Sequence, residues 1–316
     1  MRLDSRWSEV DVSVEADRIT GGGLRVPRRS LLLGGLGVVV ASTALAQETA
    51  SRPVRLGQVS LSFYAVTGAV VAEVLRRLGH SVKVRVGPHE KMFPMLAAGE
   101  IDLMAAAWLP EGHAQYWSQY GDAATQVATL YGDARFFWAV PSYVPADEVA
   151  SIADLAKPSV ASRMTRNIQG IGAGAAISRL SEQVLDLYQL RASGYSFRPG
   201  SQSDWISAYK QAVAERRWVI FPTWAPQYLN EGQLLRPLAD PKRTLGGANN
   251  AVLVAPTEKF NDLPARTRLV LSRIEIGIDG VTAMDRMVNA EGLTPEDSAR
   301  LWLGLNDQKV NSWFEA

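Results

Sequence analysis

Cysteine is absent from this sequence of 316 residues, and histidine occurs only three times, as His80, His89 and His113. Without cysteine the chain can form no disulfide, no thiolate zinc site and no cysteine nucleophile. The histidines include no pair spaced for a helical metal site, so we expect no bound metal. The formal net charge is only +1, which argues against nucleic-acid binding, because nucleic-acid-binding proteins normally carry a strongly basic face.

Motifs for enzymatic chemistry are also missing. Gly200–Asp204 lacks the second glycine of a serine-hydrolase turn. Gly170–Gly174 superficially resembles a dinucleotide-binding loop, but the sequence places no buried strand before it. These glycines fit either a tight turn or a helix start whose free N–H groups bind an anion such as a carboxylate. We therefore expect neither a cofactor nor an enzyme.

Only one apolar run approaches the length of a membrane span, and it begins at Leu31, directly after Pro27-Arg28-Arg29-Ser30. The run is followed by Ala44-Leu45-Ala46. A basic segment, an apolar core and a small-residue end are the parts of a secretory signal peptide, and paired arginines are typical of the bacterial twin-arginine route. We predict that residues 1–46 are such a signal, cleaved near Ala46, and that the protein is periplasmic; an uncleaved anchor is the alternative.

The rest of the chain alternates between strand and helix patterns. Period-two alternation or a short apolar run predicts a strand, and apolar residues three and four apart predict a helix. Strands alternating with helices indicate an α/β fold with a parallel sheet, whose ligands bind beyond the carboxyl ends of the strands. The predicted strands are 54–59, 81–86, 101–106, 136–140 and 218–221, and the predicted helices are 67–78, one around 92–96, 177–190, 264–276, 282–288 and one capped by Thr294.

Two tryptophans stand out from the others. Trp108 and Trp224 are each predicted to follow directly on a strand, and a proline comes two residues after each. Aromatic faces attract cations that cannot donate hydrogen bonds, by about 0.5–2 kcal/mol per ring. The two side chains could therefore close on a ligand from opposite sides, or pack as lids on their own parts of the chain.

Several short motifs, in their order, resemble the substrate-binding proteins of glycine betaine, choline and proline-betaine importers. The resemblance covers nearly all of residues 53–316. It rests on the segments Leu56–Val59, Leu78–His80, Gly99–Asp102, Ala107–Pro110, Val140–Val144, Ser151–Leu155, Gly172–Gly174 and Thr223–Pro226.

The resemblance implies a two-lobed periplasmic binding fold of type II, with two crossover strands and a ligand in the cleft between the lobes. One lobe would comprise residues 47–140 and 247–316, and the other residues 141–246. The crossovers are expected near Phe137–Pro141 and Gly246–Val252. Closure by a hinge motion would present a monomeric, loaded protein to a membrane permease and its ATPase.

The resemblance also implies a binding site. Trp108 and Trp224 match aromatic residues that face the quaternary ammonium group of the ligand, and Tyr143 matches a further aromatic residue. His113 resembles a histidine that can bind the carboxylate of the ligand, although a solvent-facing helix position is an equally good interpretation. Gly170 and Gly172 belong to a turn whose backbone would lie near the polar end of the ligand.

Three positions depart from the family pattern. Leu61 stands where a tryptophan is usual, Gln227-Tyr228 stands where betaine binders often have His-Trp, and Ser62 offers no acidic group of the kind found in choline binders. Phe63 or Tyr64 is the candidate to complete the aromatic cage. The expected ligand is therefore a small quaternary-ammonium solute such as glycine betaine or choline, whose identity the sequence leaves open.

Two other functions stay open at this point. The twin-arginine signal would also suit an exported enzyme that folds around a cofactor before export. A binding protein of this kind could also serve a sensor instead of a permease.

Overall fold

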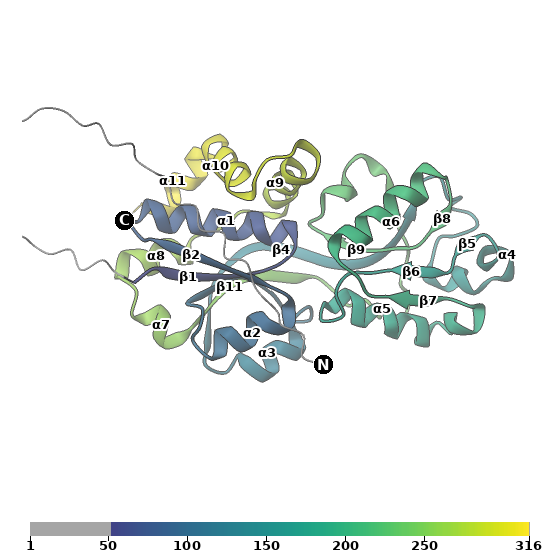
Figure 1. The fold of residues 1–316 in the computed structure, drawn as a ribbon, viewed down its shortest axis with the longest axis horizontal. Helices are drawn as coiled ribbons and strands as arrows, with labels where there is room; N and C mark the ends of the chain where they lie inside the picture. Colours follow the sequence, from purple (N-terminus) through teal and green to yellow (C-terminus); the bar gives the residue numbers. More distant parts are fainter. Residues whose placement is uncertain (1–51, 316) are drawn as a thin grey trace, which may run out of the picture. The chain divides into compact units, whose positions relative to one another are not determined.

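The computed structural model describes residues 52–315, so the predicted signal peptide at 1–46 lies outside the described residues. Within 52–315, none of the helices combines the length and the apolar character that a membrane span requires. The described chain is an α/β structure built on one sheet of seven strands (Figure 1).

The parallel half of this sheet is formed by the first three strands, as the sequence pattern predicted. β1 (Val54–Val59) pairs in parallel with β2 (Val82–Gly87) on one side and with β3 (Leu103–Leu109) on the other. All residues of β3 are buried. Burial on both faces explains why its sequence is apolar throughout instead of alternating.

Antiparallel strands continue the sheet. β4 (Ala124–Pro141) pairs with β11 (Asn249–Pro256) up to Ala134 and with β9 (Phe221–Ala225) from Arg135 onward, while β10 (Leu235–Pro237) flanks the end of β4. One strand thus joins the terminal parts of the chain (residues 52–134 and 249–315) to its middle part (residues 135–248).

The sequence predicted only the end of β4. Gly132 and Asp133 interrupt the strand pattern, and Asp133 has a left-handed φ of 57°. The register of β4 against β11 shifts beside them, between Asn249 and Ala251, which indicates a local bulge. The change of partner after Ala134 comes just before the predicted crossover at Phe137–Pro141.

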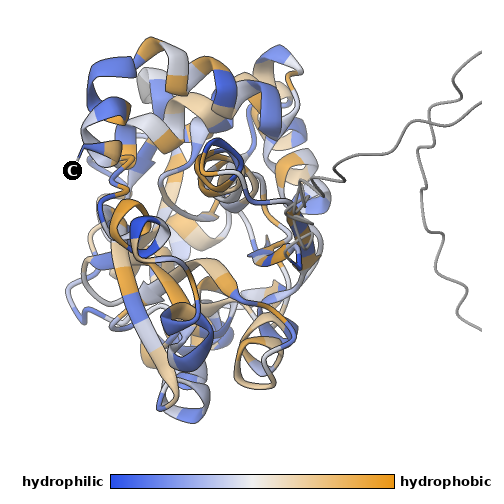
Figure 2. Ribbon diagram, turned by 90° about the vertical axis from the view of Figure 1, so that its left-hand side faces the viewer, coloured by the Kyte–Doolittle hydropathy of each residue, from blue (hydrophilic) through white to orange (hydrophobic). Residues whose placement is uncertain are grey.

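Helices pack against both faces of the terminal-part sheet (Figure 1). α1 packs against α9 and α10 on one face, and the helices combine hydrophobic with hydrophilic residues along their length (Figure 2). The Thr294 hydroxyl caps α10 by accepting the Asp297 N–H at 3.1 Å, which confirms the predicted cap. The helices are α1 (Ser62–Arg77), α2 (His89–Ala97), α3 (Ala114–Tyr120), α7 (Thr257–Asn261), α8 (Ala265–Ser272), α9 (Ile278–Glu291), α10 (Pro295–Leu305) and α11 (Asp307–Phe314).

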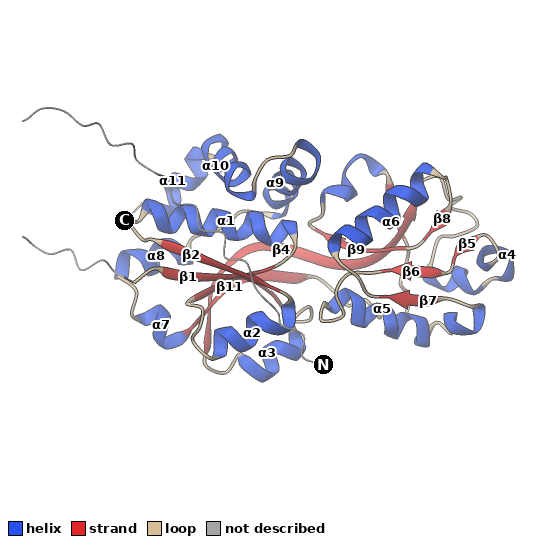
Figure 3. Ribbon diagram, in the orientation of Figure 1, coloured by secondary structure: helices blue, strands red, loops and turns tan. Residues whose placement is uncertain are grey.

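The middle part has its own short strands and helices (Figure 3). β5 pairs in parallel with β8, and β6 pairs in parallel with β7. Its elements are η1 (Ile152–Ala156), α4 (Pro158–Ala161), β5 (Met164–Thr165), β6 (Asn167–Gln169), α5 (Ala176–Leu187), η2 (Leu190–Ser193), β7 (Ser196–Arg198), α6 (Gln202–Ala214), β8 (Trp218–Val219) and η3 (Tyr228–Gln233).

Candidate functional site

Four aromatic side chains from three separate elements meet where the terminal and middle parts join. Phe63 lies between the two tryptophans, with ring centroids 5.5 Å from Trp108 and 5.6 Å from Trp224. The Tyr64 ring lies 4.1 Å from Phe63 and 6.2 Å from Trp108. At most 2% of each of these four residues is exposed. We call Phe63, Tyr64, Trp108 and Trp224 the aromatic cluster.

The two tryptophans lie within strands, not after them as predicted. Trp108 is in β3, opposite Ala251 of β11, and Trp224 is in β9, opposite Phe136 of β4. The predicted strands ended too early because they were based on apolar runs, whereas the residues that follow these runs also pair in the sheet. The strand pairing fixes both side chains, so the alternative of two separate loop lids does not hold.

Hydrogen bonds and stacking hold the tryptophan rings in place. The Trp108 indole N–H donates to the Tyr131 hydroxyl at 2.9 Å. The Trp224 ring stacks on Trp205, with centroids 4.6 Å apart and planes 17° from parallel. Trp205 is itself anchored, because its indole N–H donates to the Pro222 carbonyl at 2.8 Å. Such support keeps binding side chains in one orientation before a ligand arrives.

The aromatic cluster surrounds an inner cavity of only about 10 Å³, roughly the space of one water molecule. The lining includes no acidic side chain. The remaining lining residues are Leu61, His89, His113, Phe136, Ile171, Ala175, Ala176 and Ile177. A trimethylammonium group is larger than this space, so the rings must separate before such a group can enter.

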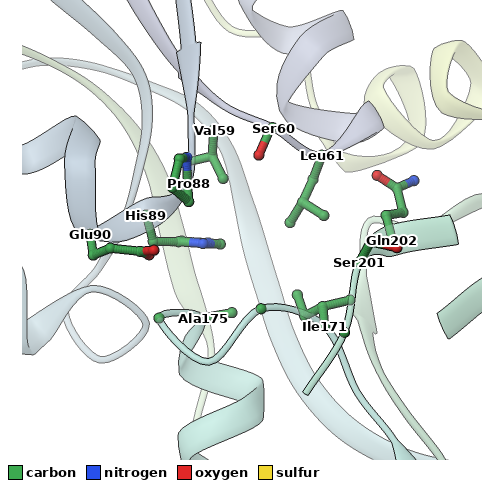
Figure 4. Close-up of a pocket in the computed structure, with 13 residues that line it drawn as sticks. Val59, Ser60, Leu61, Pro88, His89, Glu90, Ile171, Ala175, Ser201 and Gln202 are labelled. Carbon is green, nitrogen blue, oxygen red and sulfur yellow. The ribbon is translucent and has the colours of Figure 1, made fainter. Parts of the chain in front are cut away.

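A larger outer cavity of about 170 Å³ adjoins the inner one and shares Leu61, His89, Ile171 and Ala175 with it (Figure 4). It lies between the starts of α1 and α2 on one side and the loops before α5 and α6 on the other. α5 has no side-chain cap at its start, whereas the first N–H of α1, that of Ser62, donates to Gln202 Oε1 at 3.0 Å. Uncapped helix starts leave N–H groups available to a ligand, and they favour an anion.

His113 is buried, which corrects the interpretation that it faces solvent. Only 2% of it is exposed, and its Nδ1 accepts the Trp108 backbone N–H at 2.8 Å. That bond places the proton of the neutral ring on Nε2. Burial, together with the charges of His89 and Arg179, holds the pKa of His113 well below its usual value.

His89 was missed by the sequence analysis. It is the first residue of α2, 8% exposed, and its ring reaches into the outer cavity (Figure 4). Burial lowers the pKa of His89 from 6.5 to about 4, so its ring is neutral at neutral pH. Its position just beyond the carboxyl end of β2 is the signal that could have found it.

The predicted glycines divide between two roles. Gly172 lines the outer cavity. Gly170 instead allows the end of β6 to lie close to β7, because a Cβ atom at this position would lie 2.0 Å from the Phe197 ring. The structure therefore brings only Gly172 of this pair to the cavity wall.

Tyr143 is not brought to the aromatic cluster. Its hydroxyl donates to the Arg217 carbonyl at 2.7 Å, and the Arg216 guanidinium lies 5.0 Å from its ring centroid. It lines neither the inner nor the outer cavity. The Tyr143 hydroxyl also lies 3.3 Å from the Ala212 carbonyl, so Tyr143 tethers the end of α6 and the segment that follows it.

Comparison with known proteins identifies the family. The model of the substrate-binding domain of ABC-type glycine betaine transport systems matches residues 52–304. The chain belongs to this family. Its members are the solute-binding proteins of transporters. These binding proteins act outside the cytoplasmic membrane and are not enzymes.

Curated and solved relatives agree with this assignment. The glycine betaine/carnitine transport binding protein GbuC of Listeria monocytogenes is 25% identical over 160 residues, which are 51% of this chain and 53% of GbuC. The chain thus matches about half the length of that curated relative. The lactococcal OpuAC complex with glycine betaine has a TM-score of 0.75 at 24% identity, covering 84% of this chain and all of OpuAC. Borrelia burgdorferi ProX has a TM-score of 0.75 at 22% identity, over 83% of this chain and 96% of ProX. The fold is therefore the two-lobed type II binding fold.

The buried neutral His89 predicts a loss of stability in acid. Its pKa is about 4 in the folded protein and near 6.5 when unfolded, so the unfolded chain binds more protons between these values. The stabilisation is fully present above pH 6.5 and is lost as the pH falls through 4. When the pH falls from 7 to 4.5, the unfolding free energy of the parent should therefore decrease by about 2–3 kcal/mol more than that of His89→Gln.

Urea unfolding at both pH values measures this difference. Lys91→Gln changes an exposed side chain of the same helix and should lose as much stability as the parent. Equal acid losses in His89→Gln and the parent would contradict a buried, neutral His89.

Proposed function

We propose that this chain is the exported substrate-binding component of an ABC importer and that it captures a small quaternary-ammonium solute. Family membership supports the transport role. GbuC is described as a glycine betaine and carnitine binder, and the OpuAC structure contains glycine betaine. Glycine betaine, choline and related solutes are the candidates here.

The observation that carries the proposal is the aromatic cluster itself. A quaternary ammonium group has no N–H to donate, so a hydrogen-bonding pocket offers it little, whereas aromatic faces attract it through their quadrupole and through dispersion. The cluster presents two tryptophans, a phenylalanine and a tyrosine, all buried. Phe63 lies between the tryptophans and supplies a third aromatic ring of the cage. Leu61 cannot supply it, because its side chain is aliphatic.

The polar end of the solute would occupy the outer cavity. His89 and the uncapped start of α5 face this space and can donate hydrogen bonds to a hydroxyl or carboxylate. The Glu90 side chain lines the same space, so a carboxylate would have to lie on the α5 side. His113 lines only the inner cavity. We propose that its Nε2–H, fixed by the Trp108 bond, donates to the solute at the junction of the two cavities.

We retain the predicted division of the chain into two lobes, with boundaries at residues 140 and 246. Capture of the solute would involve movement of these lobes relative to each other. The inner cavity is smaller than the cationic group it must hold, so opening of the cleft is the natural entry route. We propose that the protein is a monomer and that a permease with its ATPase receives the solute from it.

A thermal-shift screen tests the function. Glycine betaine, choline, carnitine and proline betaine should be compared with proline as a non-quaternary control. A true ligand at 100 times its dissociation constant adds about 2.7 kcal/mol to the unfolding free energy, which raises the melting temperature measurably. Stabilisation by none of the quaternary solutes would contradict the proposed ligand class.

Truncation of either tryptophan tests the cage. Trp108→Ala and Trp224→Ala should each weaken binding of the best solute at least about tenfold, because up to ~2 kcal/mol per ring is lost. Replacement by phenylalanine should cost less, since a smaller aromatic face remains. Calorimetric titration measures these affinities.

The controls are residues outside the aromatic cluster. Trp117→Phe and Trp302→Phe should alter stability more than affinity. Tyr143→Phe should leave the affinity unchanged, because its hydroxyl bonds within the middle part. A Trp224→Ala variant that binds as tightly as the parent would remove that residue from the site.

Export by the twin-arginine route is also part of the proposal. Arg28 and Arg29 precede the apolar run, and this route depends on the paired arginines. Replacing both with lysine should leave uncleaved precursor in the cytoplasm, as seen by fractionation and immunoblotting. Normally processed periplasmic protein from the double variant would show that another route is used.

A further inference from the structure

A chain of hydrogen bonds connects the terminal parts to the middle part beside the aromatic cluster. The Ser62 backbone N–H donates to Gln202 Oε1 at 3.0 Å, and Gln202 Nε2 donates back to the Ser62 hydroxyl at 2.8 Å. Asp285 of α9 accepts the Tyr228 backbone N–H at 3.0 Å. Two residues of the terminal parts thus bind two separate elements, α6 and η3, of the middle part.

Asp285 has an environment unlike that of an ordinary surface carboxylate. It has no exposed surface, and Asn289 Nδ2 donates to its Oδ1 at 2.9 Å. Burial raises the pKa of Asp285 to about 6, against the opposing effect of hydrogen bonds from Ser62, Tyr228 and Asn289. The carboxylate is therefore mostly ionised at neutral pH, and hydrogen bonds to a buried charge are among the strongest in proteins.

Three of the four residues lie close in sequence to the aromatic cluster or to the ring that supports it. Ser62 precedes Phe63, and Tyr228 follows Trp224 by four residues. Gln202 lies three residues before Trp205, on which Trp224 stacks. When these bonds break, the supports of Phe63 and Trp224 are free to move apart, and the inner cavity can widen.

We propose that Ser62, Gln202, Asp285 and the Tyr228 backbone form an interlobe clasp, which holds the two lobes together over a bound solute and sets its release rate. This inference rests on the proposed function. Ser62, Tyr228 and Asp285 line neither cavity and are positioning residues, whereas Gln202 also lines the outer cavity. Asp285→Asn is therefore the variant that tests the clasp without changing a residue beside the solute. The clasp residues retain the solute by keeping the aromatic cluster assembled.

Other contacts across the same boundary are more exposed or are single bonds, as is the exposed hydrogen bond from the Gly247 N–H to Glu111 Oε2 at 2.7 Å. Tyr116 donates one hydrogen bond to the Gly174 carbonyl at 2.9 Å. Arg286 and Glu231 approach within 3.4 Å, but their side chains are 44% and 42% exposed. Exposed ion pairs contribute little. The clasp is distinguished by a fully buried charge and by the two-way pairing of Ser62 with Gln202.

Release kinetics test the clasp, with glycine betaine as the probe. Gln202→Ala removes both bonds to Ser62, and Asp285→Asn removes the charge while keeping the shape. Each should raise the dissociation rate constant about tenfold, as expected for the loss of one to two net hydrogen bonds. The association rate constant should change less than about threefold, because the clasp forms after the solute enters. Gln211→Ala, an exposed residue of the same helix bonded to Glu215, is the matched control.

A second measurement does not depend on any ligand. Because the sequence has no cysteine, single cysteines at the exposed positions Lys210 and Arg300 can carry spin labels on the two parts. In the clasp variants the distance distribution should shift toward longer values, and in Gln211→Ala it should not. If glycine betaine and the other solutes fail to bind the parent, the proposed function fails, and the label distances alone decide the clasp. Distributions that match the parent, or a parent that is open in every condition, would overturn the clasp.

Discussion

The antiparallel ladder that β4 forms first with β11 and then with β9 is the constraint on which the site depends. It places Phe136 opposite Trp224, while β11 holds β3 in register with Trp108 opposite Ala251. A shift of one residue in either ladder would turn the tryptophan to the other face of the sheet. Backbone pairing therefore sets which rings meet, and side-chain packing only refines their angles. The same strand connects the two parts of the chain, so movement between them and the shape of the aromatic cluster are linked.

Stability and binding compete at this junction. Trp108 and Trp205 have partners for their indole N–H groups, whereas buried polar atoms of Thr223, Trp224, Gln227 and Asn230 have no protein partner among the described residues. An unpaired buried polar group costs about 1–3 kcal/mol. Concentration of these groups in β9 and the segment after it is typical of a site whose polar surface is completed by something other than its own fold. The neutral buried His89 and His113 add to this cost as the pH falls.

Local patterns predicted many of the elements but their ends less well, and they missed the helices α3 and α6. The parallel strands, the amphipathic α1 and the cap at Thr294 follow from spacing that only neighbouring residues determine. β4 was recognised only in part, because a bulge at Gly132-Asp133 hides the continuity that β11 enforces. Trp108 and Trp224 were singled out from the sequence, but their place within strands depends on partners far away in the chain, Ala251 and Phe136. Motif matching put Tyr143 into the site, and its actual contacts are with the end of α6.

The sequence by itself determined the fold class, the family and the two tryptophans, because these follow from periodicity and from motifs in a fixed order. Only the tertiary structure decided which side chains join them. Phe63 enters the aromatic cluster, and Gly172 but not Gly170 lines the outer cavity. His89 and His113 become buried and neutral. Asp285, which no motif marks, lies beside the Trp224 segment. Burial and proximity arise when strands and helices distant in the chain pack together, and no local pattern encodes the distances between them.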